Sequence, residues 1–220
     1  MTIIGIDFSI LYPSVCICKD FKEFKWLSII NAKLSKKGRA NIDSLLEGKP
    51  NLFVFETSST RTKSIEYHLT ERSKLVNYVE LINLLIKKIK EITAGETDFL
   101  FSIEGMSFGS SGNALVDIAQ STGMLKLKIV EEILNDEAER LFVFSPSELK
   151  NTIGCKGNAN KFEIYSKFKN DPGLESIKES DLYLLSNQDD IIVKDQQVLS
   201  PFMDMIDAYL GVLKIYNQIK

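Results

Sequence analysis

Histidine and cysteine are scarce in this chain, with one and three residues respectively, which is too few for the metal centres usually built from them. Cys16 and Cys18 alternate with Ile17 in an apolar run, so we expect reduced thiols on a strand rather than a disulfide framework. No run approaches the roughly 20 apolar residues of a membrane span, and the first residues lack the basic start of a secretion signal. We therefore expect a cytoplasmic protein.

An excess of positive charge is also missing. The net charge is -3, so the chain as a whole does not attract nucleic acid, and a binding surface would need a local concentration of lysines. The length of 220 residues with 44% apolar side chains is sufficient for one domain with a buried core.

The apolar periodicity predicts three opening strands and then alternating helices and strands. The strands are expected at 3–8, 13–19, 24–30, 99–104 and 141–144, and the helices at 75–89, 115–129, 158–168 and from 203. Two polar stretches, at about 33–71 and 170–199, are interpreted as insertions, the first with a strand-like island at 52–55. The expected fold is a single α/β domain over 1–220, with a mixed sheet of about five strands flanked by helices.

Four carboxylates stand where a site would form. Asp7 and Glu104 each end an apolar strand, and the carboxyl ends of strands are where α/β sheets bind ligands. Asp204 and Asp207 are three positions apart on a predicted helix and project from one face. Buried carboxylates require a partner, and a metal ion is the simplest one. The alternative is that these acids only cap turns and complement a helix dipole.

A local concentration of lysines occurs near residue 150. From Ser145 to Asn170 five lysines outnumber two glutamates, which gives +3 in a chain of net -3. Glycines in the same segment would let backbone N–H groups and ammonium groups approach phosphates, and Lys150, Lys156 and Lys161 are the candidate contacts. Lysines on helix faces can also be simply solvated.

With these residues placed, the chain resembles the RuvC-type Holliday junction resolvases of the RNase H-like superfamily, over 1–30 and 97–213. The similar segments are Asp7 with its strand, Glu104–Ala114 followed by Gln120–Gly123, the basic segment Phe144–Lys161, and Asp204–Ala208. Among these, the basic segment is the most specific, because its lysines and glycines recur at fixed offsets.

The resemblance implies a crossover junction endodeoxyribonuclease of DNA recombination and repair, with an RNase H-like fold. It implies two Mg²⁺ ions, replaceable by Mn²⁺, bound by the four carboxylates, and branched DNA as the substrate. Phe108 would stack on an unpaired base, although it could equally fold into the core. A two-fold junction is most simply cut by a symmetric homodimer, for which the 114–129 helix is the candidate interface.

The sequence departs from the family after Asp7, where Phe8–Ser14 lacks the usual glycines. This divergence would suit a phage-encoded member acting in a bacterial or phage-infected cell. Three alternatives remain open: a nuclease for flaps, forks or RNA–DNA hybrids, a catalytically inactive DNA-binding relative, or an actin-like ATPase. The last requires a second glycine-bearing Asp loop, which is not found between Leu34 and Thr97.

Overall fold

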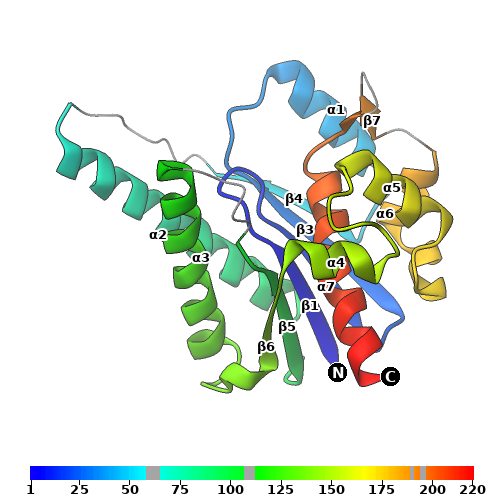
Figure 1. Cartoon of the computed structure of the whole chain (residues 1–220). Helices are drawn as coiled ribbons and strands as arrows, with labels where there is room; N and C mark the ends of the chain where they lie inside the picture. Colours follow the sequence, from blue (N-terminus) through cyan, green and yellow to red (C-terminus); the bar gives the residue numbers. More distant parts are fainter. Residues whose placement is uncertain (58–64, 107–111, 189–190, 194–196) are drawn as a thin grey trace.

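A computed structural model describes residues 1–57, 65–106, 112–188, 191–193 and 197–220. Its centre is a six-stranded sheet in the order β4-β3-β2-β1-β5-β6 (Figure 1). The strands are β1 (Thr2–Asp7), β2 (Ser14–Lys19), β3 (Glu23–Ile30), β4 (Leu52–Glu56), β5 (Phe99–Glu104) and β6 (Leu141–Phe144). Only β2 is antiparallel to its neighbours in this sheet, so the other strands all end at one edge.

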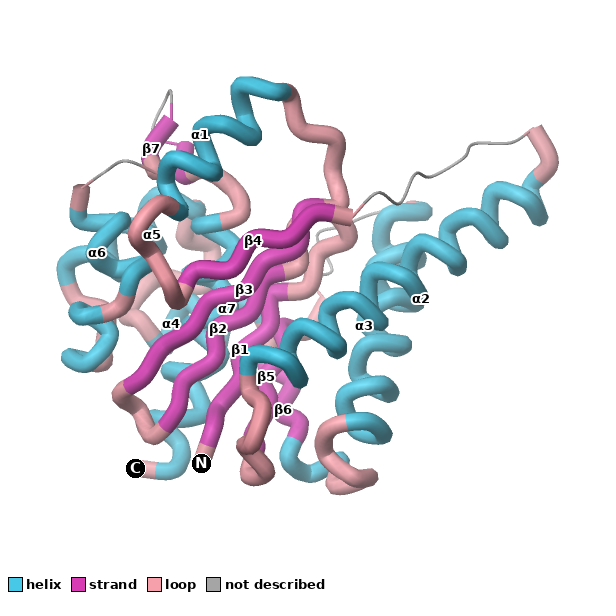
Figure 2. Tube along the Cα trace, turned by 180° about the vertical axis from the view of Figure 1, so that it is seen from behind, coloured by secondary structure: helices cyan, strands magenta, loops and turns pink. Residues whose placement is uncertain are grey.

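Helices cover both faces of the sheet (Figures 1 and 2). One face packs against α2 (Tyr67–Ile92) and α3 (Asn113–Glu132). The other packs against α7 (Phe202–Ile219), with α4 (Pro146–Thr152), α5 (Lys161–Asn170) and α6 (Asp181–Asn187) around it. No helix in the described part of the chain is both long enough and apolar enough to cross a membrane.

The sheet confirms the predicted mixed α/β fold with helices on both faces, with six strands where about five were expected. The additional strand is the island at 52–55, which forms β4 and pairs in parallel with β3 at the sheet edge. The rest of the stretch 33–71 is also more regular than predicted, because α1 (Lys36–Leu46) lies within it and α2 begins at Tyr67. The polar composition of α1, in which only Ile42 is buried, explains why no helical periodicity was visible.

The stretch 170–199 likewise contains regular structure rather than an extended loop. It forms a 3₁₀ helix (Glu175–Glu179), α6, and the short hairpin of β7 (Ile192–Val193) and β8 (Gln197–Val198). Ile177, Leu182 and Leu185 are fully buried in the core beneath α7. These elements are too short for periodicity to reveal them, and their apolar residues are spaced among acids and serines.

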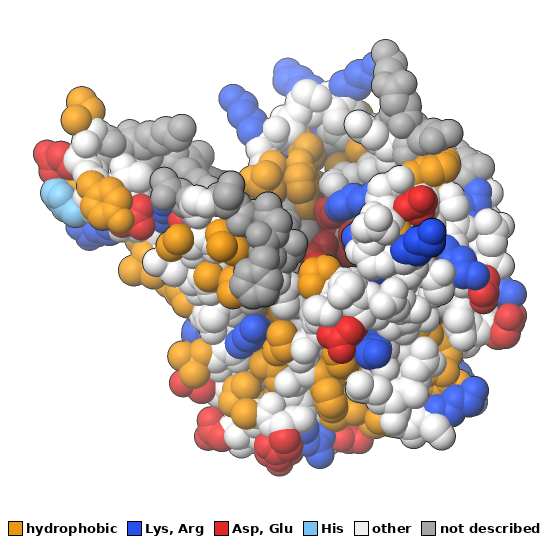
Figure 3. Space-filling view, in the orientation of Figure 1, with side chains coloured by type: hydrophobic (Ala, Val, Ile, Leu, Met, Phe, Trp, Pro, Cys, Tyr) orange, Lys and Arg blue, Asp and Glu red, His pale blue; other side chains and the backbone are white. Residues whose placement is uncertain are grey.

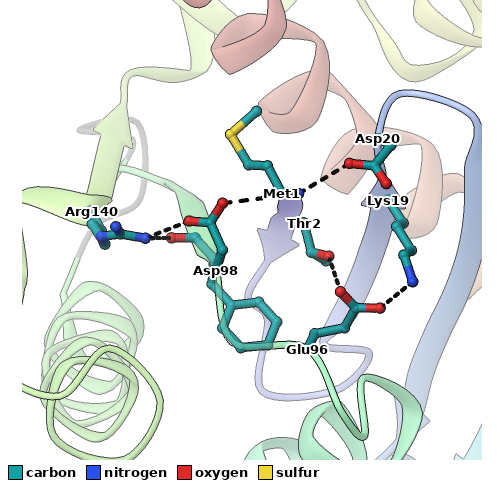
Figure 4. Close-up of polar contacts among 8 residues, drawn as sticks. Met1, Thr2, Lys19, Asp20, Glu96, Asp98 and Arg140 are labelled. Carbon is teal, nitrogen blue, oxygen red and sulfur yellow. Dashed lines mark hydrogen bonds and ion pairs between the residues drawn. The ribbon is translucent and has the colours of Figure 1, made fainter.

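At the edge where β1 begins, ion pairs join residues at the ends of four strands, β1, β2, β5 and β6 (Figure 4). The Met1 ammonium donates to Asp20, Lys19 pairs with Glu96 at 2.6 Å, and Arg140 pairs with Asp98 at 2.8 Å. Each such exposed pair contributes little to the free energy of unfolding. The carboxylates of the predicted site lie at the opposite edge.

Candidate metal and nucleic-acid site

The structure brings the four predicted carboxylates to the edge where the parallel strands end. Asp7 ends β1, Glu104 ends the neighbouring strand β5, and Asp204 and Asp207 lie in the first two turns of α7. Carboxylate oxygens of Asp7, Asp204 and Asp207 lie within 4.8 Å of one another, so they could hold one metal ion. Glu104 is outside that group and lines an adjoining cavity of about 150 Å³ together with Asp7.

Two close backbone contacts place these acids opposite one another. A Cβ atom at Gly5 would lie 2.0 Å from the Ala208 carbonyl oxygen, so β1 and α7 touch there and only glycine fits. Gly5 and Asp7 share one strand face, and Asp204 lies one helical turn before Ala208. Two residues along a strand and four along a helix both advance by roughly 6 Å. The contact at Gly5 therefore sets Asp7 opposite Asp204.

The same geometry recurs on the neighbouring strand. A Cβ atom at Gly211 would lie 2.1 Å from the hydroxyl oxygen of Ser102, which is 1% exposed. Glu104 follows Ser102 on the same face of β5, and Asp207 precedes Gly211 by one helical turn. This second contact sets Glu104 opposite Asp207.

The electrostatics of the cluster call for a cation. Burial, together with the charges of Asp207, Asp204 and Glu104, raises the pKa of Asp7 well above its ordinary value. Burial raises the pKa of Asp207 to about 7, although the ammonium of Lys161 opposes the shift. Burial also raises the pKa of Glu104. Carboxyl groups that resist ionisation together are stabilised as anions when a positive charge lies between them.

Lys161 supplies one such charge in this structure. Its Nζ atom lies 2.7 Å from a carboxylate oxygen of Asp204 and 3.6 Å from one of Asp207. Burial lowers the pKa of Lys161, but the two aspartates outweigh this effect and raise it above its ordinary value. Lys161 therefore lies at the carboxylates, whereas the sequence suggested only a phosphate contact.

The other predicted lysines differ in their surroundings. Lys150 is half-buried, donates a hydrogen bond of 2.9 Å to the carbonyl oxygen of Ala159, and its charge lowers the pKa of Glu104. Lys156 is exposed on the loop between α4 and α5. Pro146 starts α4, where Ser145 and Glu148 form a capping box. Phe108 lies outside the described residues.

A cleft opens beside the carboxylates, in the recess that Figure 3 shows between acidic, basic and hydrophobic side chains. Its volume is about 480 Å³, and Asp204 and Lys161 are part of its lining. The remaining walls come from the turn between β1 and β2 and from the start of α3; they include Phe8, Ile10, Leu11, Tyr12, Ala114 and Ile118. Sequence reasoning noted this turn as a departure from the family and assigned it no function.

Comparison with known proteins finds similar solved structures but no relative by sequence. No family model matches the sequence, and no curated protein matches it. Two solved structures align over 99% of this chain and over 96% of their own chains, each with a TM-score of 0.46. They are a RuvC structure from Thermus thermophilus, at 12% identity, and a T. thermophilus RuvC in complex with a Holliday junction substrate, at 10%.

Proposed function

We propose that this protein is a divalent-metal-dependent nuclease that hydrolyses phosphodiesters in branched DNA. The observation that carries the proposal is the convergence of Asp7, Asp204 and Asp207 within 4.8 Å, with Glu104 beside them, from three separate segments of the chain. Ordinary capping acids have no reason to meet in a partly buried cluster in which the pKa values of Asp7, Asp207 and Glu104 are raised. A metal site gives that cluster a physical reason.

The donor set fits Mg²⁺, with Mn²⁺ as a substitute, because all four candidate ligands are carboxylates and hard cations prefer oxygen. The Lys161 ammonium against Asp204 and Asp207 shows that a positive charge is accommodated at the cluster. Two bound ions would activate a water molecule and stabilise the leaving oxygen of the phosphodiester. In our proposal, Asp7 is the ligand shared by the two ions.

The remaining groups of the chain act on the DNA. Lys156, exposed on its loop, is placed to pair with a phosphate away from the site of cleavage. Lys150 and Lys161 lie close enough to affect the pKa of Glu104 and are placed to contact the phosphate at which cleavage occurs. In this proposal the three lysines bind the DNA backbone, and the carboxylates hold the metal ions that promote hydrolysis.

The branched substrate is the finer part of the proposal, and flap, fork and RNA–DNA hybrid substrates are its competitors. Cleavage of a panel of labelled four-way, three-way, flap and hybrid substrates with Mg²⁺ discriminates among them. Preferential cutting of the four-way junction is expected. Preferential cutting of another member would reassign the substrate but leave the nuclease proposal intact.

A two-fold junction also leads us to propose a homodimer formed through α3. Val116 and Leu127 are 52% and 57% exposed on this helix, and Gly123 has open space around it. Ser121, on the same helix, is buried, and its hydroxyl donates to the Asp117 carbonyl oxygen, so it does not contribute to this surface. Sedimentation that shows a monomer both alone and on junction DNA would remove the dimer.

Asp7→Asn tests the metal site directly. Asparagine keeps the shape of the side chain but removes a charge, so cleavage should fall by orders of magnitude while junction binding is kept or improved. Asp43→Asn, on the exposed surface of α1, is the matched control and should cut normally. A folded Asp7→Asn protein that cuts a four-way junction at the parent rate in Mg²⁺ would contradict the proposal.

A further inference from the structure

The cleft beside the carboxylates has two chemically different ends. At one end lie Asp204, which belongs to the acid cluster, and Lys161, which pairs with it at 2.7 Å. The other end is mostly apolar and is formed by the turn between β1 and β2 facing the first turns of α3. The charged residue at this end is Asp117, which pairs with Lys74 at 3.0 Å. A ligand that fills the cleft must therefore join an anionic group at the first end to a flat or apolar group at the second.

The apolar end is accessible and includes an aromatic side chain. Leu11 is 51% exposed, and Ile10 and Tyr12 are partly exposed beside it. The turn is held in shape by the Tyr12 backbone N–H, which donates to the Ser9 hydroxyl at 2.9 Å, and by the Asn31 amide, which donates to the Ile10 carbonyl oxygen at 2.8 Å. These side chains are thus presented on a braced turn, although apolar groups are normally withdrawn from water.

We propose that this cleft binds one unstacked nucleobase, from the nucleotide next to the phosphate that is cleaved. The inference rests on the proposed nuclease function and deepens it by naming what the substrate must offer. A nucleotide has the required combination, because its phosphate suits the end with Lys161 and its base suits the apolar end with Tyr12. The volume of about 480 Å³ lies within the range of small-ligand sites.

A base in this cleft has left its duplex neighbours. Extrusion from a helix costs stacking and pairing energy, and the cost is smallest where the base is already unpaired. Bases at a branch point or in a single-stranded segment meet that condition. The cleft therefore gives a physical reason for cutting next to a branch, independent of any contact with the branch as a whole.

The experiment removes the base and leaves the backbone. After the cleavage position is mapped with the wild-type protein, the nucleotide on each side of it is replaced in turn by an abasic analogue, and kcat/KM is compared with that of the intact substrate. One of the two replacements should lower kcat/KM about tenfold to hundredfold, the usual effect of losing one stacked base.

Two variants alter the cleft without touching the acids. Leu11→Ser removes apolar surface from an exposed position, and Ala114→Phe fills the cleft from the first turn of α3. In both, the intact and abasic substrates should be cut at rates within about threefold of each other. Leu184→Phe, at an exposed position of α6 that does not line the cleft, is the matched control and should keep the full preference.

A binding measurement separates this inference from the nuclease proposal. An oligonucleotide with 2-aminopurine at an unpaired position, titrated with the protein in Ca²⁺, should change fluorescence with wild type and Leu184→Phe but much less with Ala114→Phe. Cleavage that is indifferent to both abasic replacements, or fluorescence changes that are the same in all three proteins, would overturn the base site. Absence of cleavage with a cleft-dependent fluorescence change would instead overturn the nuclease and keep the base site.

Discussion

Replacement of Asp207 by asparagine should stabilise the protein when no metal is present. Burial raises the pKa of this carboxyl from 3.8 to about 7 in the folded chain. A group whose pKa is higher when folded gives stability that is complete below the unfolded pKa and is lost as the pH rises through the folded pKa. In a chelator, the wild-type protein should therefore lose stability between about pH 4 and pH 8. The asparagine variant lacks this part of the loss.

The size of the effect follows from the same two pKa values. The difference between 3.8 and about 7 corresponds to about 4 kcal/mol, at 1.36 kcal/mol per pH unit. The new amide would still neighbour Asp7 and Asp204, and the substitution removes the contact with Lys161 at 3.6 Å, so about half of this is expected. A gain of about 2 kcal/mol raises Tm by about 4–8 °C in a chain of this size.

Thermal denaturation of both proteins in chelator, near pH 5 and near pH 8, measures the gain, which should be clearly larger at the higher pH. Millimolar Mg²⁺ or Mn²⁺ at the higher pH should reverse the order, because metal binding stabilises the wild type and the variant has lost a ligand. Equal pH dependence of Tm in the two proteins, or equal stabilisation by metal, would refute the idea that Asp207 belongs to a cation site.

Two further predictions concern Lys150 and Lys156, and the close contact between β1 and α7. Lys156→Ala should lower the slope of log DNA affinity against log salt concentration by about one unit without changing Tm. Lys150→Ala should lower that slope too, and it should also lower Tm because it loses the hydrogen bond to the Ala159 carbonyl oxygen. An unchanged slope for both variants would mean that DNA binds to another face of the protein. Gly5→Ala should lower Tm and weaken Mg²⁺ binding, because α7 must shift to make room for the added methyl group, at a cost of about 1–3 kcal/mol or more. Gly123→Ala is the matched control, because Gly123 has open space around it. Equal Tm values for these two variants would contradict the prediction.

The strands of the sheet and the positions of the four acids could be predicted because short sequence patterns indicate them. Buried parallel strands are continuous apolar runs, so the ends of β1 and β5 at Asp7 and Glu104 were visible in the sequence. The spacing of Asp204 and Asp207 on an amphipathic helix placed both on one face. Their meeting at one edge is then a consequence of parallel strands ending together.

The other parts of the site depend on contacts that no local pattern encodes. Lys161 looks like any exposed lysine at the start of a helix, and only the docking of α5 beside α7 brings it to Asp204. The cleft is built from segments that lie far apart in the sequence, so no sequence pattern indicated that the apolar turn at Leu11 lines it. Polar helices such as α1 are similarly invisible, because a single buried residue leaves no periodicity.

The wide separation of the acids along the chain has a consequence for how the protein is made. Asp7 lies on β1 and is translated about 200 residues before Asp204 and Asp207, which lie on α7. A chain that stops before residue 204 keeps its lysine loop but lacks two of the four acids and the helix that fills one face of the sheet. Synthesis interrupted before α7 would therefore leave a fragment that cannot complete the proposed metal site.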